Sequence, residues 1–155
     1  MAKTAKTGTA RRPSQLTRDN LGFLLAKASQ RWNELLAERF AAAGFPEVRP
    51  SYGSILIPLY EEDGLRIGEI ARRARLSKQT MTTMVRLLER DGLVERRPDP
   101  QDGRAALVFL THHARAFRPV AEAALRELTR LAQRRLGTAT ADTLSAALRQ
   151  LAELA

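Results

Sequence analysis

Apolar residues recur at steps of three and four along much of this chain, which is the spacing of one helix face. Over residues 16–43 this stripe is almost continuous, and it predicts a long amphipathic helix that ends at Gly44. Two later stripes predict a long helix that includes Phe117 and a last helix that Thr140 caps, with Gly137 between them.

Shorter helical segments lie between these long helices. A short helix capped by Ser51 is expected to run to residue 60. Residues 67–73 predict another, and a tight three-residue connection separates it from a helix that starts at Ser77 and is closed by Gly92. Two short helices joined in this way match the helix-turn-helix motif, whose second helix enters the major groove of DNA.

The pattern then changes to that of a β-hairpin. Residues 94–97 and 105–110 suit two antiparallel strands, and the connecting residues 98–103 are rich in Pro, Asp and Gly. The predicted fold is therefore mainly α with a small β-hairpin wing: a winged helix-turn-helix flanked by long helices.

Periodicity divides the helix that follows Ser77 into two faces. The apolar face and the preceding helix are expected to form a small core from Ile70, Ala71, Leu76, Met81, Met84, Val85 and Leu88. The other face carries short hydroxyls, an amide and cations, which are groups that read base edges and phosphates: Lys78, Gln79, Thr82, Thr83, Arg86 and Arg90. The polar face of an ordinary surface helix would look similar, and the hairpin is what favours the DNA-binding interpretation.

Three arginines mark the hairpin. Arg104 lies at its tip, where it is expected to insert into a minor groove, and Arg96 and Arg97 lie at its base. Asp102 has two equally good interpretations: it orients the Arg104 guanidinium through a charge-assisted pair, or it stabilises the turn.

Composition narrows the class of partner. The 155 residues carry a formal charge of +9, which favours a polyanion, either nucleic acid or an anionic membrane surface. Residues 66–104 hold ten basic against six acidic side chains, and residues 1–18 hold five basic side chains and no acid. No cysteine is present, and neither a secretory signal nor a membrane-spanning run is visible, so a cytoplasmic protein without disulfides is expected.

The residues around the hairpin resemble the MarR family of winged-helix transcriptional regulators. The resemblance rests on Leu-Ser-Lys-Gln-Thr at 76–80, Leu-Glu-Arg-Asp-Gly-Leu-Val at 88–94, and Asp102-Gly103-Arg104 with Leu110-Thr111. It covers about residues 18–154, with one departure: Ala114 stands where the family often has glycine. It implies DNA contacts from the recognition helix and wing, and these residues are Ser77, Gln79, Thr80, Thr82, Thr83, Arg86, Asp102 and Arg104.

The same resemblance implies a homodimer in which the first and last two helices interlock. The leucine stripes of the long helices independently call for a partner surface. The expected organisation is a flexible basic arm (1–15), an N-terminal dimerisation helix and loop (16–50), a winged helix-turn-helix DNA-binding domain (51–111) and C-terminal dimerisation helices (112–155). Two recognition helices would then lie about 34 Å apart, one turn of DNA.

A small-molecule effector is a further implication of the resemblance, with a cleft between the dimer helices and the winged-helix lobe as its site. Candidate lining residues are Trp32, Phe40, Tyr52, Tyr60 and His112 or His113, and ordinary core packing is the favoured interpretation of the aromatic side chains. Neither these adjacent histidines nor the run of carboxylates at 61–63 predicts a metal site, because neighbouring side chains do not converge on one ion.

Two functions remain open. The first is a regulator, most often a repressor, that binds double-stranded DNA at a pseudo-palindromic operator and is released by a small aromatic or phenolic ligand. The second is a non-sequence-specific, architectural DNA-binding protein. An enzyme is disfavoured, because the chain has no glycine-rich phosphate loop, HExxH motif or cysteine nucleophile, and no cofactor is expected.

Overall fold

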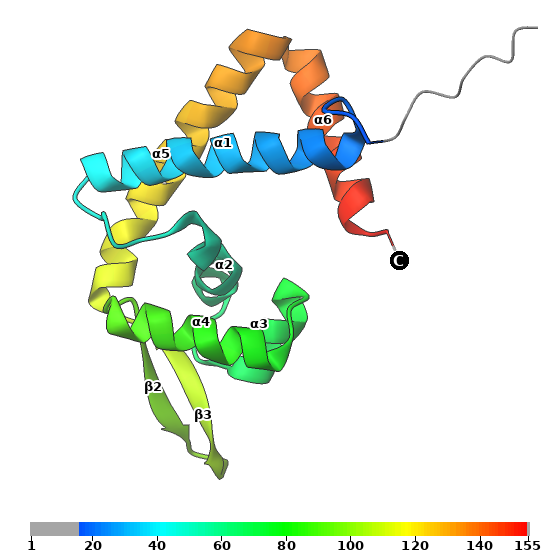
Figure 1. Cartoon of the computed structure of the whole chain (residues 1–155). Coiled ribbons are helices and arrows are strands. Elements are labelled where there is room, and N and C mark those ends of the chain that lie inside the picture. The colour runs from blue at the N-terminus through cyan, green and yellow to red at the C-terminus, as the bar shows by residue number, and fades with distance from the viewer. Residues whose placement is uncertain (1–15, 155) are drawn as a thin grey trace, which may run out of the picture.

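The computed structural model describes residues 16–154, so the predicted basic arm at 1–15 lies outside the described residues. The described residues form six α-helices, a short 3-10 helix and a three-stranded sheet (Figure 1). In chain order these are α1 (Leu21–Ala42), η1 (Pro50–Tyr52), α2 (Gly53–Glu61), β1 (Leu65–Arg66), α3 (Ile67–Ala74), α4 (Lys78–Arg90), β2 (Val94–Asp99), β3 (Asp102–Leu110), α5 (His112–Leu136) and α6 (Thr138–Ala152).

Three predicted helix starts were wrong. The first helix begins after Asn20, not at residue 16, because the Asn20 carboxamide accepts the Phe23 amide at 2.9 Å. Ser51 lies inside η1 and caps nothing. The last helix starts at Thr138, directly after Gly137, whose positive φ of 85° ends α5, so Thr140 is an interior residue.

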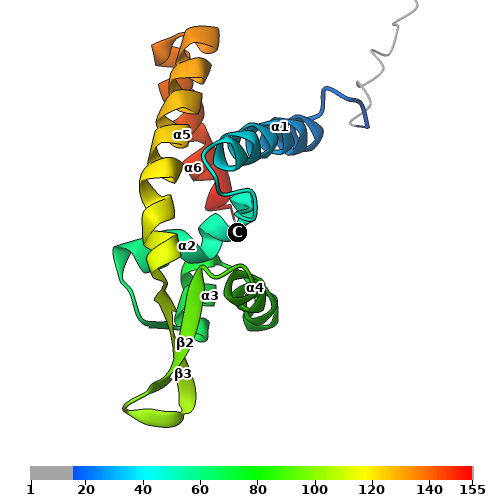
Figure 2. The same cartoon turned by 90° about the vertical axis from the view of Figure 1, so that its left-hand side faces the viewer.

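The elements form two groups. The long helices α1, α5 and α6 lie together: α5 turns back into α6, and α1 crosses both (Figures 1 and 2). Below them, α2, α3 and α4 pack with the sheet, and the β2–β3 hairpin extends away from the helices. One buried cluster runs through both groups, and at their junction the Phe40 and Phe117 rings meet edge to face with centroids 4.8 Å apart.

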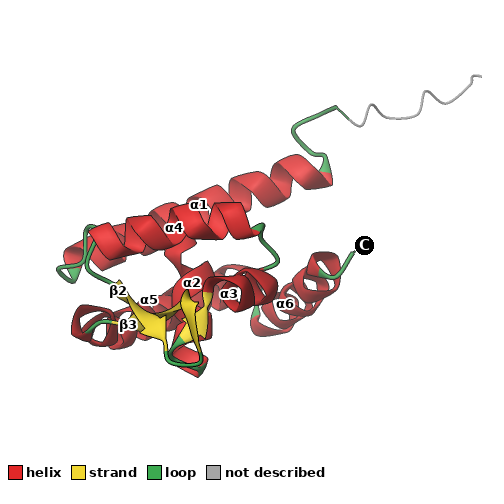
Figure 3. Ribbon diagram, turned by 90° about the horizontal axis from the view of Figure 1, so that it is seen from below, coloured by secondary structure: helices red, strands yellow, loops and turns green. Residues whose placement is uncertain are grey.

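The sheet has the order β1-β3-β2, and both pairings are antiparallel. Seen from below, the strands lie beside α2 and α3 (Figure 3). The hairpin strands are longer than predicted, and the two-residue β1 was not predicted at all. Gly64, just before β1, has a φ of +73°, and a Cβ there would lie 2.7 Å from the Phe109 ring, so only glycine fits this approach.

Candidate nucleic-acid interface

The recognition helix α4 begins where the sequence predicts. The Ser77 hydroxyl accepts the Thr80 amide at 3.0 Å and donates to the Thr80 hydroxyl at 2.8 Å. At its other end α4 gives way to Gly92, whose φ of +74° confirms the predicted closing glycine. Both ends of the helix are therefore set by local chemistry.

The apolar face of α4 anchors the motif. Buried members of the predicted core are Ile70, Ala71, Met81, Val85 and Leu88, and Met84 is half-buried. Leu76 was predicted to join them and does not: its side chain is 38% exposed. The reason is local, because Arg75 takes a left-handed conformation (φ 53°) and Leu76 follows it in the turn, outside either helix stripe.

The opposite face of α4 presents its polar groups to solvent. Lys78, Gln79, Thr80, Thr83 and Arg86 are exposed and Thr82 is half-buried. The Thr82 hydroxyl donates to the Lys78 carbonyl at 2.8 Å, and the Thr83 hydroxyl donates to the Gln79 carbonyl at 3.2 Å. Within residues 16–154, neither Lys78 nor Arg86 forms an ion pair, so both charges are available to a partner.

Arg90, the last cation of that face, is held in an ion pair within the protein. Arg90 pairs with Asp91 at 3.1 Å, and the buried Tyr52 donates its hydroxyl to the same carboxylate at 2.5 Å. The hydrogen bonds from Arg90 and then Tyr52 lower the pKa of Asp91. Because Tyr52 lies in η1, this contact fixes the C-terminal end of α4 against the segment that enters the winged-helix lobe.

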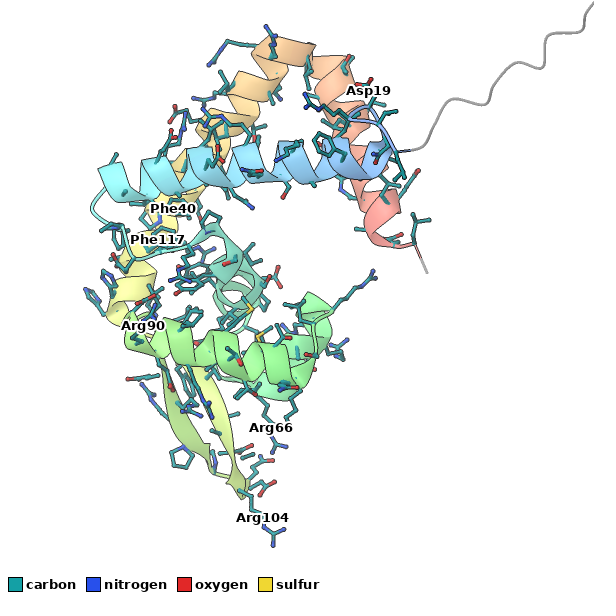
Figure 4. The ribbon with its side chains drawn as sticks, in the orientation of Figure 1. Asp19, Phe40, Arg66, Arg90, Arg104 and Phe117 are labelled. Atoms are coloured by element: carbon teal, nitrogen blue, oxygen red, sulfur yellow. The ribbon has the colours of Figure 1, made fainter. Side chains whose placement is uncertain are left out.

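The three wing arginines differ in whether their guanidinium groups form ion pairs within the protein. Arg96 is paired with Glu89 at 2.6 Å, and Arg97 is paired with Glu95 while its guanidinium lies 4.5 Å from the centroid of the Phe109 ring. Arg104 forms no ion pair with any described residue, and its side chain extends from the wing tip away from the body (Figure 4). Of the three wing arginines, Arg104 is therefore the one whose guanidinium is available to bind a partner such as DNA.

Of the two roles predicted for Asp102, the structure shows stabilisation of the turn. Its carboxylate accepts the backbone amide of Arg104 at 3.1 Å, which is turn chemistry. A pairing with the Arg104 guanidinium is absent among the described contacts. The reason is the extended direction of the Arg104 side chain at the tip (Figure 4).

A different acid holds the wing, and the sequence pattern did not reveal it. Asp99 is the buried polar residue of the described chain, and its Oδ2 accepts the Arg66 Nε at 2.8 Å and Nη2 at 2.5 Å. Its Oδ1 accepts the Gln101 amide at 2.9 Å. The Gln101 amide first, and Arg66 second, lower the pKa of Asp99 below its usual value.

Comparison with known proteins agrees with this geometry. The MarR family profile matches residues 50–106, which run from η1 into the wing. The curated HTH-type transcriptional regulator TtmR of Methylorubrum extorquens (strain PA1) is 31% identical over 116 residues, which are 75% of this chain and 58% of TtmR. The chain spans less than two thirds of the length of the curated relatives it matches first.

Solved structures match over more of their length. A probable transcriptional regulator from Pseudomonas aeruginosa is 32% identical, with a TM-score of 0.74 over 86% of this chain and 97% of that one. The chain belongs to the MarR family. The transcriptional repressor CouR, solved on a 23-mer DNA duplex, is 27% identical with a TM-score of 0.74, over 90% of this chain and all of CouR.

MarR-family proteins are DNA-binding transcriptional regulators and not enzymes. In this member Lys78 and Arg86 of α4 and Arg104 at the wing tip are exposed and form no ion pair with another described residue, and Arg104 points away from the long helices (Figure 4). Within residues 16–154, no helix is both long and apolar enough to cross a membrane.

Four of the residues predicted to line an effector site of this MarR-family chain belong to one hydrophobic cluster or pack against it: Trp32, Phe40, Tyr52 and Tyr60. Tyr60 donates its hydroxyl to the Ala114 carbonyl at 2.6 Å, and burial raises its pKa to about 12. His112 and His113 are both exposed, and His113 bonds Glu47 at 2.5 Å and stacks on Phe45. Phe40 and Tyr52 are buried in the core.

Trp32 alone of that set lines a sizeable cleft. The cleft has a volume of about 610 Å³ and lies between α1, α5 and α6, where mostly apolar side chains line it. Leu144 and Leu148 of α6 face it, and both remain more than 40% exposed. None of the described residues of α6 is buried, so this helix has an apolar side without a partner in the single chain.

Proposed function

We propose that this chain is a homodimeric, ligand-responsive repressor that binds a pseudo-palindromic operator. The observation that carries the proposal is the presence of two sets of cations without ion pairs among the described residues: Lys78 and Arg86 on α4, and Arg104 on the wing. A helix enters the major groove while an arginine at a hairpin tip enters the adjacent minor groove. The DNA duplex bound by CouR supports DNA as the partner.

The long helices support the dimer. Leu144 and Leu148 lie beside the Trp32 cleft, and Leu131 and Leu136 of α5 are also more than 40% exposed. Exposed leucines in such number are characteristic of a surface that another copy covers. Association of two copies through α1, α5 and α6 places two α4 helices on one DNA duplex.

Binding-site selection from random duplexes tests the operator. We expect enrichment of an inverted repeat whose half-sites are about one helical turn apart, because two-fold symmetry of the protein imposes two-fold symmetry on its site. Affinity for the selected site should exceed that for scrambled DNA by about a thousandfold or more at physiological salt.

The architectural alternative predicts a different result in that experiment. The basic character of the chain would then give tight binding with a steep salt dependence and no enriched sequence. Selection that returns no repeat would therefore contradict the operator proposal.

Release by a small ligand is the third part of the proposal. The apolar Trp32 cleft and the family resemblance support a small aromatic or phenolic ligand as effector. A thermal-shift screen of such compounds should find a stabilising ligand, because a compound that binds only the folded state raises the melting temperature.

Trp32 is the single tryptophan of the chain, so its fluorescence reports on the cleft. The stabilising compound should change the Trp32 emission and weaken operator binding over the same range of concentration. A compound that stabilises the protein and leaves operator affinity unchanged is not an effector, and a screen without any stabilising compound counts against ligand control.

A further inference from the structure

The tip of the wing is attached to the body of the protein through one carboxylate. The side chain of Asp99 is only 8% exposed, and it closes on the Nε and Nη2 of Arg66. Arg66 itself is half-exposed and belongs to β1 and to the N-terminal boundary of α3. The contact therefore joins the far end of the hairpin to the helix-turn-helix, across 33 positions of sequence.

The backbone of the hairpin needs such an attachment at this point. The β2–β3 register becomes irregular between Pro98 and Asp99, and beyond it only the Asp99–Asp102 pair remains. Pro98 has no amide hydrogen to give to the ladder. The Asp99 side chain supplies what the ladder lacks, because it accepts the Gln101 amide with one oxygen and Arg66 with the other.

We propose that the Arg66–Asp99 pair is a positioning device that aims Arg104 at the minor groove while α4 occupies the major groove. The proposal rests on the proposed function, and it adds two residues that make no base contact themselves. Arg66 fixes Asp99, Asp99 fixes the turn, and Asp102 of the same turn holds the amide of Arg104. The Arg104 side chain remains free to bind, but its starting point is fixed relative to α3 and α4.

The competing explanation is that Arg66 is one more phosphate contact. The two explanations predict opposite signs for Asp99→Asn. A positioning role predicts weaker operator binding, by about tenfold, because the charge-assisted pair is lost and the tip is released. A phosphate role predicts tighter binding, because the substitution removes an acid and frees the Arg66 charge. Unchanged or tighter binding by Asp99→Asn overturns the proposal.

A double-mutant cycle gives the second test. Arg66 and Arg104 are not in contact in the structure, so independent contributions to DNA binding would add. If Arg66 acts through Arg104, then Arg104→Ala costs much less affinity in the Arg66→Ala background than in the wild type. A difference of about tenfold between the two backgrounds supports positioning, and additive losses contradict it.

The control is an exposed ion pair far from the wing. Arg31 and Glu34 of α1 pair at 3.1 Å, and Arg31→Ala and Glu34→Gln repeat the two charge changes at that site. Both control variants should keep wild-type operator affinity. Circular dichroism and melting temperature establish that all variants are folded.

Hydrogen exchange separates failure of this proposal from failure of the proposed function, because it needs no DNA. The Gln101 and Arg104 amides should exchange faster in Arg66→Ala than in the wild type, with the α4 amides unchanged. If selection returns no operator, the proposed function fails, but hydrogen exchange still shows whether the Arg66–Asp99 pair holds the wing tip. Unchanged exchange at Gln101 and Arg104 shows that Arg66 does not hold the tip.

Discussion

Replacing Arg86 and Arg104 together by alanine should abolish operator binding and leave the protein folded. Each side chain is exposed and unpaired within residues 16–154, so its removal breaks no internal contact. A specific arginine contact to DNA is worth about 1–3 kcal/mol. Losing the major-groove contact of Arg86 and the minor-groove contact of Arg104 therefore weakens binding by about a hundredfold or more per copy of the chain. Fluorescence anisotropy with the selected operator measures the loss, and circular dichroism checks the fold.

A variant with the same loss of charge elsewhere is the matched control. Arg126 and Arg130 of α5 are exposed, form no ion pair with the described residues and lie on the helix that leads away from the wing. Arg126→Ala with Arg130→Ala should keep sequence-specific binding, with only a small general loss from the reduced charge. Equal losses in both double variants would mean that net charge, and not α4 and the wing, determines affinity.

Placing two carboxylates on the apolar side of α6 should convert the dimer into a monomer. The Leu144 and Leu148 side chains are 46% and 42% exposed in the single chain. Leu144→Glu with Leu148→Glu therefore places two charges in the surface that a second copy is proposed to cover. Burial of an unpaired charge costs several kcal/mol, which is comparable to the free energy that holds a micromolar dimer together. Sedimentation equilibrium should show the monomer mass, and operator affinity should fall at least a hundredfold because only one half-site is held.

The other side of the same helix provides the comparison. Ala146 and Gln150 are exposed and lie one turn apart, away from the Leu144–Leu148 side. Ala146→Glu with Gln150→Glu adds the same two charges and should leave the dimer intact. A Leu144→Glu–Leu148→Glu protein that remains dimeric would place the interface elsewhere.

Local chemistry is the part of this fold that the sequence reveals well. The Ser77 cap, the closing Gly92 and the change from helical to alternating spacing predicted α4 and the hairpin, because each depends on residues within a few positions. The start of α1 was missed because the apolar stripe extends past the actual cap at Asn20. The two-residue β1 was missed because two residues carry no periodicity.

The sequence pattern did not predict contacts between segments that are distant along the chain. Asp102, two residues before the wing arginine, was predicted either to pair with its guanidinium or to stabilise the turn, yet the ion pair that holds the wing joins Asp99 to Arg66. The aromatic residues predicted for an effector site looked equivalent in sequence, but in the fold Phe40 and Tyr52 are buried in the core whereas Trp32 lines a cleft. The DNA contacts of α4 and the wing stay predictions until a complex is measured.

Two of the three threonines of α4, Thr82 and Thr83, limit what this helix can recognise. The hydroxyl hydrogens of Thr82 and Thr83 are committed to the helix's own carbonyls, so towards a major groove these side chains offer methyl groups and oxygen lone pairs. Such groups match the thymine methyl and the amino groups of adenine N6 and cytosine N4, not the acceptors of guanine. A guanine in the half-site must therefore be read by Lys78, Gln79, Thr80 or Arg86, whose donors are not committed to carbonyls of the helix.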